Sequence, residues 1–225
     1  AIKRRSNKEP IAYITGKKDF WSETFNVSRA TLIPRPETEL LIYKIIKLFK
    51  NKNINILDIG TGSGCILLSI LKELKFSTGT GIDISNSAVK VAISNAKKLK
   101  LSNRAKFKVF DINKFDFGKY DLIVSNPPYI PYKEIKKLSK DIRNFEPHIA
   151  INGGKDGLDL IKKVIYKSTI LLKKNGLFAL EMGTNQYFKV SAIMSKYGFR
   201  MIGKEFDYNN NVRCIISTKV WFFKF

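Results

Sequence analysis

The feature of this sequence that most constrains its fold is a regular alternation between short apolar runs and longer amphipathic stretches. From residue 54 onward, runs rich in Ile, Val, Leu and Phe alternate with segments whose apolar residues recur at helical spacing, such as Val89, Ala92 and Ala96. Strands that alternate with helices form right-handed βαβ units, which build a parallel sheet with helices packed against it. The sequence therefore predicts an α/β fold.

The spacing of apolar residues also gives the expected elements. Strands are expected at residues 54–59, 80–84, 105–110, 120–124, 176–182, 199–206 and 213–218. Helices are expected at residues 65–75, 87–99, 158–173 and 187–197, and an earlier helix opens at Pro36. No helical pattern separates the last two strands, which indicates a hairpin in which one strand runs antiparallel. We expect a seven-stranded, mostly parallel sheet with an antiparallel strand from this terminal hairpin.

Length and composition fit one large globular domain. The chain has 225 residues, of which 44% are hydrophobic and 27% are charged, so it can bury a sizeable core. No apolar run reaches the roughly 20 residues needed to cross a bilayer, and the first residues lead into polar sequence rather than a secretion signal. Two cysteines cannot form a disulfide framework or a zinc site on their own. We expect a cytoplasmic protein without metal or membrane contact.

The net charge is strongly positive and has two interpretations. Lys and Arg number 41 against 19 Asp and Glu, which gives a formal charge of +22 at pH 7. An excess of this size is typical of proteins that work beside RNA or the ribosome. The lysines are scattered rather than clustered, however, as a general bias towards Lys, Ile and Asn also produces. Charge alone therefore does not choose the partner.

A glycine-rich loop follows the first of these strands and opens the next helix. Residues 58–65 read Asp-Ile-Gly-Thr-Gly-Ser-Gly-Cys. Glycines let a ligand lie against the backbone, and a helix N-terminus offers free N–H groups. The loop lacks the Gly-Lys-Ser/Thr ending of a phosphate-binding loop, and Cys65 occupies the third glycine position of the dinucleotide fingerprint. The pattern D-x-G-x-G-x-G instead resembles the cofactor loop of class I S-adenosylmethionine methyltransferases.

This resemblance implies a class I S-adenosylmethionine-dependent methyltransferase fold with S-adenosyl-L-methionine as cofactor. In that class the acid at Asp58 faces the methionine moiety, and the acid at Asp83 accepts hydrogen bonds from the ribose hydroxyls. Residues 111–112 would flank the adenine. Ligands of open α/β sheets bind at the carboxyl ends of strands, where all three positions fall. The expected cofactor-binding residues are Asp58, Gly60, Thr61, Gly62, Ser63, Gly64, Asp83, Asp111, Ile112 and Asn126.

The tetrapeptide Asn126-Pro127-Pro128-Tyr129 follows the fourth strand and suits methylation of a planar NH₂ group. Two prolines fix two φ angles and remove two N–H donors, which leaves the Asn126 amide oxygen and the Pro127 carbonyl as rigid acceptors. These acceptors would hold both hydrogens of the nitrogen and turn its lone pair towards the methyl group, with Tyr129 as an aromatic wall. No histidine base is needed, and His148 is interpreted as structural. The motif resembles one shared by methylases of adenine or guanine amines and of glutamine amides, and does not separate them.

The N-terminal third separates these substrates. With the tetrapeptide, several stretches closely resemble the peptide chain release factor glutamine methyltransferases, and the resemblance covers nearly the whole chain. They are residues 9–16 (EPIAYITG), 20–21 (FW), 32–39 (LIPRPETE), 145–147 (FEP) and 153–157 (GGKDG). The part at residues 35–39 is the most discriminating. The resemblance implies methyl transfer to the side-chain amide nitrogen of the glutamine in the Gly-Gly-Gln motif of class I release factors.

The resemblance also implies roles for the parts of the chain. Residues 1–50 are interpreted as an N-terminal stub and substrate-side segment, and residues 51–225 as the methyltransferase domain, ending in an apolar tail at 221–225. A class I release factor is the expected partner, and a monomer the expected state. The alternative is methylation of an exocyclic amine of adenine or guanine in RNA or DNA, which predicts a base-flipping pocket and a basic groove. The expected catalytic and substrate-binding residues are Asn126, Pro127, Pro128 and Tyr129, joined on the substrate side by Arg35 and Glu37.

Overall fold

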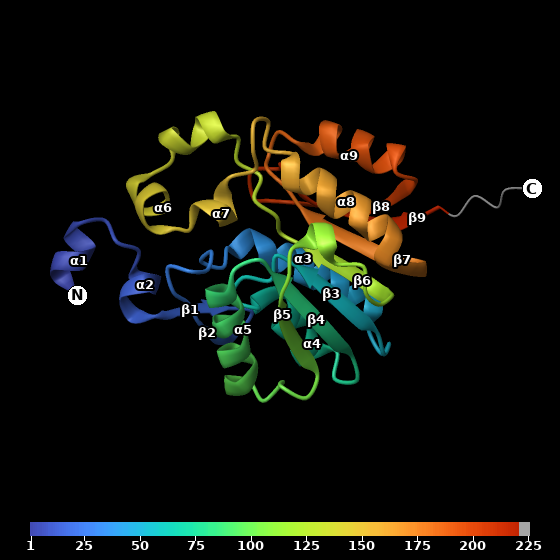
Figure 1. Ribbon diagram of the computed structural model, residues 1–225, viewed down its shortest axis with the longest axis horizontal. Helices are drawn as coiled ribbons and strands as arrows, with labels where there is room; N and C mark the ends of the chain where they lie inside the picture. Colours follow the sequence, from blue (N-terminus) through green and yellow to red (C-terminus); the bar gives the residue numbers. More distant parts are fainter. Residues whose placement is uncertain (221–225) are drawn as a thin grey trace, which may run out of the picture.

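Seven strands pair into one sheet in the computed structural model, which describes residues 1–220 (Figure 1). The strands are β3 (Asn55–Ile59), β4 (Thr78–Asp83), β5 (Ala105–Val109), β6 (Tyr120–Ser125), β7 (Leu172–Glu181), β8 (Phe199–Phe206) and β9 (Val212–Lys219). Their order across the sheet is β5-β4-β3-β6-β7-β9-β8, so the direction of winding reverses between β3 and β6. The apolar tail at 221–225 lies outside the described residues.

β9 is the antiparallel strand of this sheet. It pairs antiparallel with both β7 and β8, whereas the strands from β3 to β7 pair in parallel. This confirms the predicted seven-stranded, mostly parallel sheet with an antiparallel hairpin strand. β9 is inserted between β7 and β8 because its apolar run, Cys214 to Ile216, is buried on both faces, while β8 alternates buried and exposed residues and forms the edge.

Helices cover both faces of the sheet (Figure 1). One face carries α3 (Pro36–Phe49), α4 (Cys65–Glu73) and α5 (Asn86–Lys98). The other carries α8 (Asp159–Leu171) and α9 (Tyr187–Lys196). Alternate strand residues face opposite sides, so on β6 Leu122 and Val124 join the core under α3 and α4, and Ile123 joins the core under α8 and α9. Each face of the sheet therefore has its own hydrophobic core.

The N-terminal segment forms a small unit that packs against the sheet domain. It consists of α1 (Ile2–Ser6), α2 (Ile11–Thr15) and an antiparallel hairpin of β1 (Lys17–Phe20) and β2 (Glu23–Asn26). The buried Glu9 carboxylate joins it through ion pairs with Arg4 and Arg29, which hold the pKa of Glu9 at about 2. Leu41 and Ile42 of α3 are fully buried under the sheet. Helix α3 therefore packs into the core of the sheet, and Phe20 and Phe25 of the hairpin belong to the same hydrophobic cluster.

A long excursion between β6 and α8 holds short helices that the apolar spacing did not predict. They are η2 (Tyr132–Lys137), α6 (Lys140–Phe145) and α7 (His148–Ile151), and they lie on the same side of the molecule as α1 and α2 (Figure 1). The excursion closes on itself where Ile130 bridges Asn152. His148 is outside the cavity lining described below, with its Nε2 3.1 Å from the Arg143 carbonyl oxygen.

Two absences hold for residues 1–220. No helix there has both the length and the apolar character needed to cross a bilayer. The same residues contain no group of three or more His, Cys, Asp or Glu placed to bind a metal ion.

Gly79 and Gly81 on β4 have no room for a side chain. A Cβ atom would lie 2.4 Å from Leu67 Cδ1 at Gly79, and 2.6 Å from the Phe107 ring at Gly81. We expect Gly79→Ala or Gly81→Ala to lower the free energy of unfolding by about 1–3 kcal/mol, the usual cost of overpacking, as measured by chemical denaturation. The control is Gly203→Ala on β8, where the nearest atom is 3.4 Å away and belongs to a lysine side chain. Equal losses at all three positions would contradict this account.

Candidate active site

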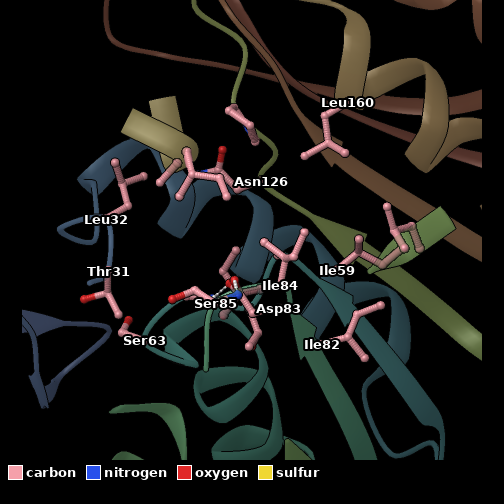
Figure 2. Close-up of a pocket in the computed structure, with 18 of the residues that line it drawn as sticks. Thr31, Leu32, Ile59, Ser63, Ile82, Asp83, Ile84, Ser85, Asn126 and Leu160 are labelled. Carbon is pink, nitrogen blue, oxygen red and sulfur yellow. Dashed lines mark hydrogen bonds between the residues drawn. The ribbon is translucent and has the colours of Figure 1, made fainter. Parts of the chain in front are cut away.

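A cavity of about 520 Å³ opens at the carboxyl ends of β3, β4 and β6 (Figure 2). Its wall includes the glycine loop after β3, the turn after β4, the segment after β5 and Asn126 after β6. This is the point where the winding of the sheet reverses, which is where open α/β sheets bind ligands. The volume lies within the range of small-molecule pockets, about 300–1,000 Å³.

The glycine loop forms one wall with its backbone. Gly60, Gly62 and Gly64 have φ angles of +74°, +54° and +79°, a region that residues with a Cβ atom rarely adopt. The N–H groups of Gly60 and Thr61 donate to the Ile82 carbonyl at 2.9 and 3.0 Å, which ties the loop to β4. All three glycine positions are therefore required by the shape of this loop.

Asp83, the last residue of β4, both holds the loop and lines the cavity (Figure 2). Its Oδ2 accepts from the Gly62 N–H and its Oδ1 from the Ser85 N–H, both at 2.9 Å. Burial raises the pKa of Asp83, and these backbone donors lower it. A carboxylate oxygen can accept more than one hydrogen bond, so each retains capacity for a hydroxyl group in the cavity. The geometry fits a vicinal diol such as ribose.

Asp58 lies behind the glycine loop rather than in the cavity lining. It is fully buried, and its Oδ2 accepts from the Thr61 hydroxyl at 2.6 Å. Its Oδ1 has no hydrogen-bond partner among the described residues. Burial raises the pKa of Asp58 to about 7. The carboxyl supports the loop from inside, and its contact with the methionine moiety stays a prediction.

The segment after β5 forms the far end of the cavity. Phe110, Asp111 and Ile112 line it. Asp111 Oδ1 accepts from the Asn113 N–H at 2.9 Å and so caps the short 3-10 helix η1 (Ile112–Lys114). The structure therefore brings three successive strand ends to one cavity, and the role of residues 111–112 beside adenine stays a prediction.

The tetrapeptide after β6 contributes Asn126 and Pro128 to the cavity lining. Asn126 Nδ2 donates to Thr38 Oγ1, in the first turn of α3, at 3.3 Å. Thr38 is a residue that the sequence analysis did not single out, although it falls within the discriminating stretch 35–39. Figure 2 shows Asn126 apart from the turn that holds Asp83 and Ser85. The amide is therefore placed at the side of the cavity away from Asp83.

Pro127 and Tyr129 lie outside the cavity lining. The Tyr129 hydroxyl accepts from Arg213 Nη2 at 3.0 Å, and its carbonyl oxygen accepts from Gln186 Nε2 at 2.9 Å. Burial raises the pKa of Tyr129. These contacts fix the far end of the tetrapeptide, and the aromatic wall expected from Tyr129 stays a prediction.

The two expected substrate-side residues lie in different surroundings. Arg35 lines the cavity, and its Nη2 is 2.5 Å from Oε1 of the buried Glu146. Glu37 is half-buried and outside the lining. A further acid, Glu181, is buried beside the site and was not predicted. The sequence feature that could have pointed to Glu181 is that it is a single acid at the otherwise apolar end of β7.

Comparisons with known proteins were made by sequence and by structure. A family model described as a methyltransferase domain matches residues 50–219. A release factor glutamine methyltransferase from Buchnera aphidicola subsp. Schizaphis graminum is 44% identical over 97% of this chain and 78% of its own length. Across seven relatives with this name, the chain spans 62–78% of their length.

Solved structures share the fold at low identity. A methyltransferase from Pyrococcus furiosus has a TM-score of 0.68 at 17% identity, over 97% of this chain and 99% of its own. Magnesium protoporphyrin IX methyltransferase from Synechocystis, solved with bound S-adenosylmethionine, has a TM-score of 0.59 at 14% identity, over 82% of this chain and 78% of its own.

The order of the sheet, the glycine loop with Asp83 beside it and the matching family model define the class, which is that of S-adenosylmethionine-dependent methyltransferases. The cavity fits this cofactor, because Asp83 keeps acceptor capacity for the ribose and the loop presents bare backbone. Within that class, the identity and coverage of its relatives show that the chain belongs to the family of release factor glutamine methyltransferases.

We expect Asp83→Ala to weaken S-adenosylmethionine binding by about 1–3 kcal/mol, because the ribose loses a charge-assisted acceptor and the loop loses its anchor at Gly62. Titration calorimetry measures the dissociation constant directly. Asp19→Ala, on the exposed β1–β2 hairpin, is the matched control and should bind normally. Unchanged affinity in Asp83→Ala would remove this residue from the site.

The raised pKa of Asp58 predicts a pH-dependent stability in the absence of cofactor. Between the ordinary carboxyl pKa of about 4 and the folded value of about 7, the folded state holds a proton that the unfolded state releases. Asp58 therefore stabilises the fold at low pH, and this contribution is lost as the pH rises towards 7. Between pH 5 and 6 the free energy of unfolding should fall less steeply with pH in Asp58→Asn than in the wild type. The difference between the two slopes should be at most about 1.4 kcal/mol per pH unit. Denaturation of both proteins at several pH values measures the slopes, and equal slopes would contradict the raised pKa.

Proposed function

We propose that this protein transfers the methyl group of S-adenosylmethionine to the side-chain amide nitrogen of the glutamine in the Gly-Gly-Gln motif of class I peptide chain release factors. The observation that carries the proposal is the hydrogen bond between Asn126 and Thr38. It joins the amine-methylating motif to the stretch of sequence that most distinguishes the release factor enzymes. The membership of the family supports the same substrate.

The chain's own residues would act by positioning. When bound, S-adenosylmethionine supplies an electrophilic methyl group on a sulfonium. The nitrogen of a primary amide is conjugated and weakly nucleophilic, so the enzyme has to align its lone pair with that methyl. Asn126 Oδ1, in the cavity lining, would accept one N–H hydrogen of the glutamine and hold the nitrogen in place. The Pro127 carbonyl remains the predicted acceptor of the second hydrogen, although Pro127 is outside the lining. Rigid acceptors of this kind lower the barrier because they need no reorganisation during the reaction.

Arg35 and its partner would shape the entrance on the substrate side. The ion pair of Arg35 with Glu146 ties the start of α3 to the excursion that contains α6 and α7. Because Arg35 also lines the cavity, its guanidinium is available near an incoming peptide. In this proposal Glu37 acts indirectly, since its charge is felt by Glu181 and Arg213 and it does not line the cavity.

The second candidate is methylation of an exocyclic amine of adenine or guanine in RNA or DNA. It is favoured by the formal charge of +22 and by the tetrapeptide, which suits any planar NH₂ group. A ribosomal or RNA environment and a monomeric state stay predictions. The two candidates differ in salt dependence, because neutralising about 6–10 phosphates makes affinity fall by roughly 10³–10⁵ between 50 and 200 mM salt.

The test is methyl incorporation from labelled S-adenosylmethionine into a class I release factor, with total RNA and DNA as competing acceptors. We expect label in the release factor, none in a release factor whose Gly-Gly-Gln glutamine is replaced by alanine, and only a moderate salt effect. Asn126→Ala should lower turnover by about 100-fold or more, the scale for losing one preorganised polar group, while it still binds the cofactor. Label in nucleic acid that vanishes steeply with salt would instead support the second candidate.

A further inference from the structure

Glu181, the last residue of β7, is a fully buried carboxyl group beside the cavity. Its Oε2 accepts from the Thr38 hydroxyl at 2.7 Å. Thr38 Oγ1 in turn accepts from Asn126 Nδ2 at 3.3 Å. The three side chains come from β7, α3 and the end of β6, and they form one hydrogen-bond chain that ends at the cavity.

The direction of the donors along this chain follows from Glu181. When Glu181 is ionised, its carboxylate only accepts hydrogen bonds, so the single Thr38 hydroxyl proton points towards it. With that proton engaged, Thr38 Oγ1 can only accept from its other neighbour. The Asn126 amide therefore presents its NH₂ side to Thr38 and turns Oδ1 away from it. Without such a partner, the two orientations of an asparagine amide are close in energy.

The charge of Glu181 is balanced from the opposite side. Arg213 Nη2 on β9 lies 4.0 Å from Glu181 Oε1, and the Arg213 side chain is 11% exposed. Burial raises the pKa of Glu181 to about 7, and Glu37 adds to the rise, while the Thr38 hydroxyl, Arg213 and the Asn126 side chain oppose it. Arg213 also donates to the Tyr129 hydroxyl at 3.0 Å. The neighbours of Glu181 therefore contact both ends of the tetrapeptide: Thr38 contacts Asn126, and Arg213 contacts Tyr129.

We propose that Glu181, acting through Thr38, is a positioning residue that holds the Asn126 amide with its oxygen towards the substrate nitrogen. The inference rests on the proposed function, because it gives that oxygen the task of accepting an N–H hydrogen of the glutamine amide. If the Asn126 amide were reversed, its NH₂ group would face the N–H groups of the substrate glutamine. Two donors would then meet, and the lone pair of the glutamine nitrogen would not be aligned with the methyl group. The hydrogen bonds from Glu181 through Thr38 exclude the reversed amide before the substrate binds. The site is therefore preorganised.

The test removes the Thr38 hydroxyl and keeps the shape of the side chain. We expect Thr38→Val to lower kcat about 10- to 100-fold, with less than a threefold change in KM for the release factor and in cofactor affinity, because valine keeps the shape of this side chain in the cavity lining and removes only its hydroxyl. Thr38→Ser keeps the hydroxyl and should recover turnover to within about threefold of wild type. Chemical denaturation of both variants shows whether each is folded.

A double variant separates positioning from a merely structural role. If Thr38 acts through Asn126, adding Thr38→Val to Asn126→Ala should change kcat by less than about twofold, since coupled residues are not additive. Independent losses that multiply would overturn the proposal, as would normal turnover in Thr38→Val or a serine variant no better than valine.

Different results would reject the positioning role of Glu181 and Thr38 and the proposed function. A wild-type enzyme that leaves the release factor glutamine unmethylated would reject the proposed function. Wild-type methylation of that glutamine, together with an unimpaired Thr38→Val variant, would reject the positioning role of Glu181 and Thr38 alone.

Discussion

The pairing of β3 with β6 is the constraint on which the rest of the site depends. Ile59 lies opposite Ser125 in the register, and the Ser125 hydroxyl donates to the Ile59 carbonyl at 2.7 Å. The next residue on one strand opens the glycine loop, and the next on the other is Asn126. The glycine loop and the tetrapeptide at residues 126–129 therefore start at the same level of the sheet. Because the winding reverses here, the two segments diverge and leave a cavity between them.

The stretches that mark the family are joined in space by specific contacts. The Trp21 N–H donates to Glu39 Oε1 at 2.9 Å, and Arg35 pairs with Glu146. Thr38 connects the same segment to the interior of the sheet. Residues 35–39 thus hold the hairpin, the excursion and Asn126 together around the N-terminus of α3. The stretches that resemble the family therefore occur together in one sequence because their side chains contact one another in the fold.

Several charged groups of the site are buried at a cost to stability. The Asp58, Glu146 and Glu181 carboxyls are all within 3% of complete burial, and burial raises the pKa of each. Buried carboxylates are destabilising unless partners compensate. Thr61, Arg35 and Thr38 supply those partners, one for each carboxyl. The buried acids therefore hold the loop, the excursion and the Asn126 amide in place, and their burial lowers the free energy of unfolding.

Sequence periodicity determined the α/β class, the strands and the antiparallel hairpin, because apolar spacing reflects which faces are buried. The motifs at residues 58–65 and 126–129 predicted two segments of the cavity wall, because glycine permits the positive φ angles of the loop and proline fixes φ. Periodicity did not predict the short helices between β6 and α8, which lack a long apolar stripe. Only the tertiary structure decided that Asp58 supports the loop from behind, that Tyr129 turns towards Arg213, and that Thr38 bridges Glu181 and Asn126. The Asp58–Thr61 contact is local, but the shape of its loop depends on the bonds of that loop to β4. The other contacts join residues far apart in the chain, and their geometry depends on how α3 packs on the sheet and on the place of β9 within it, which no local pattern encodes.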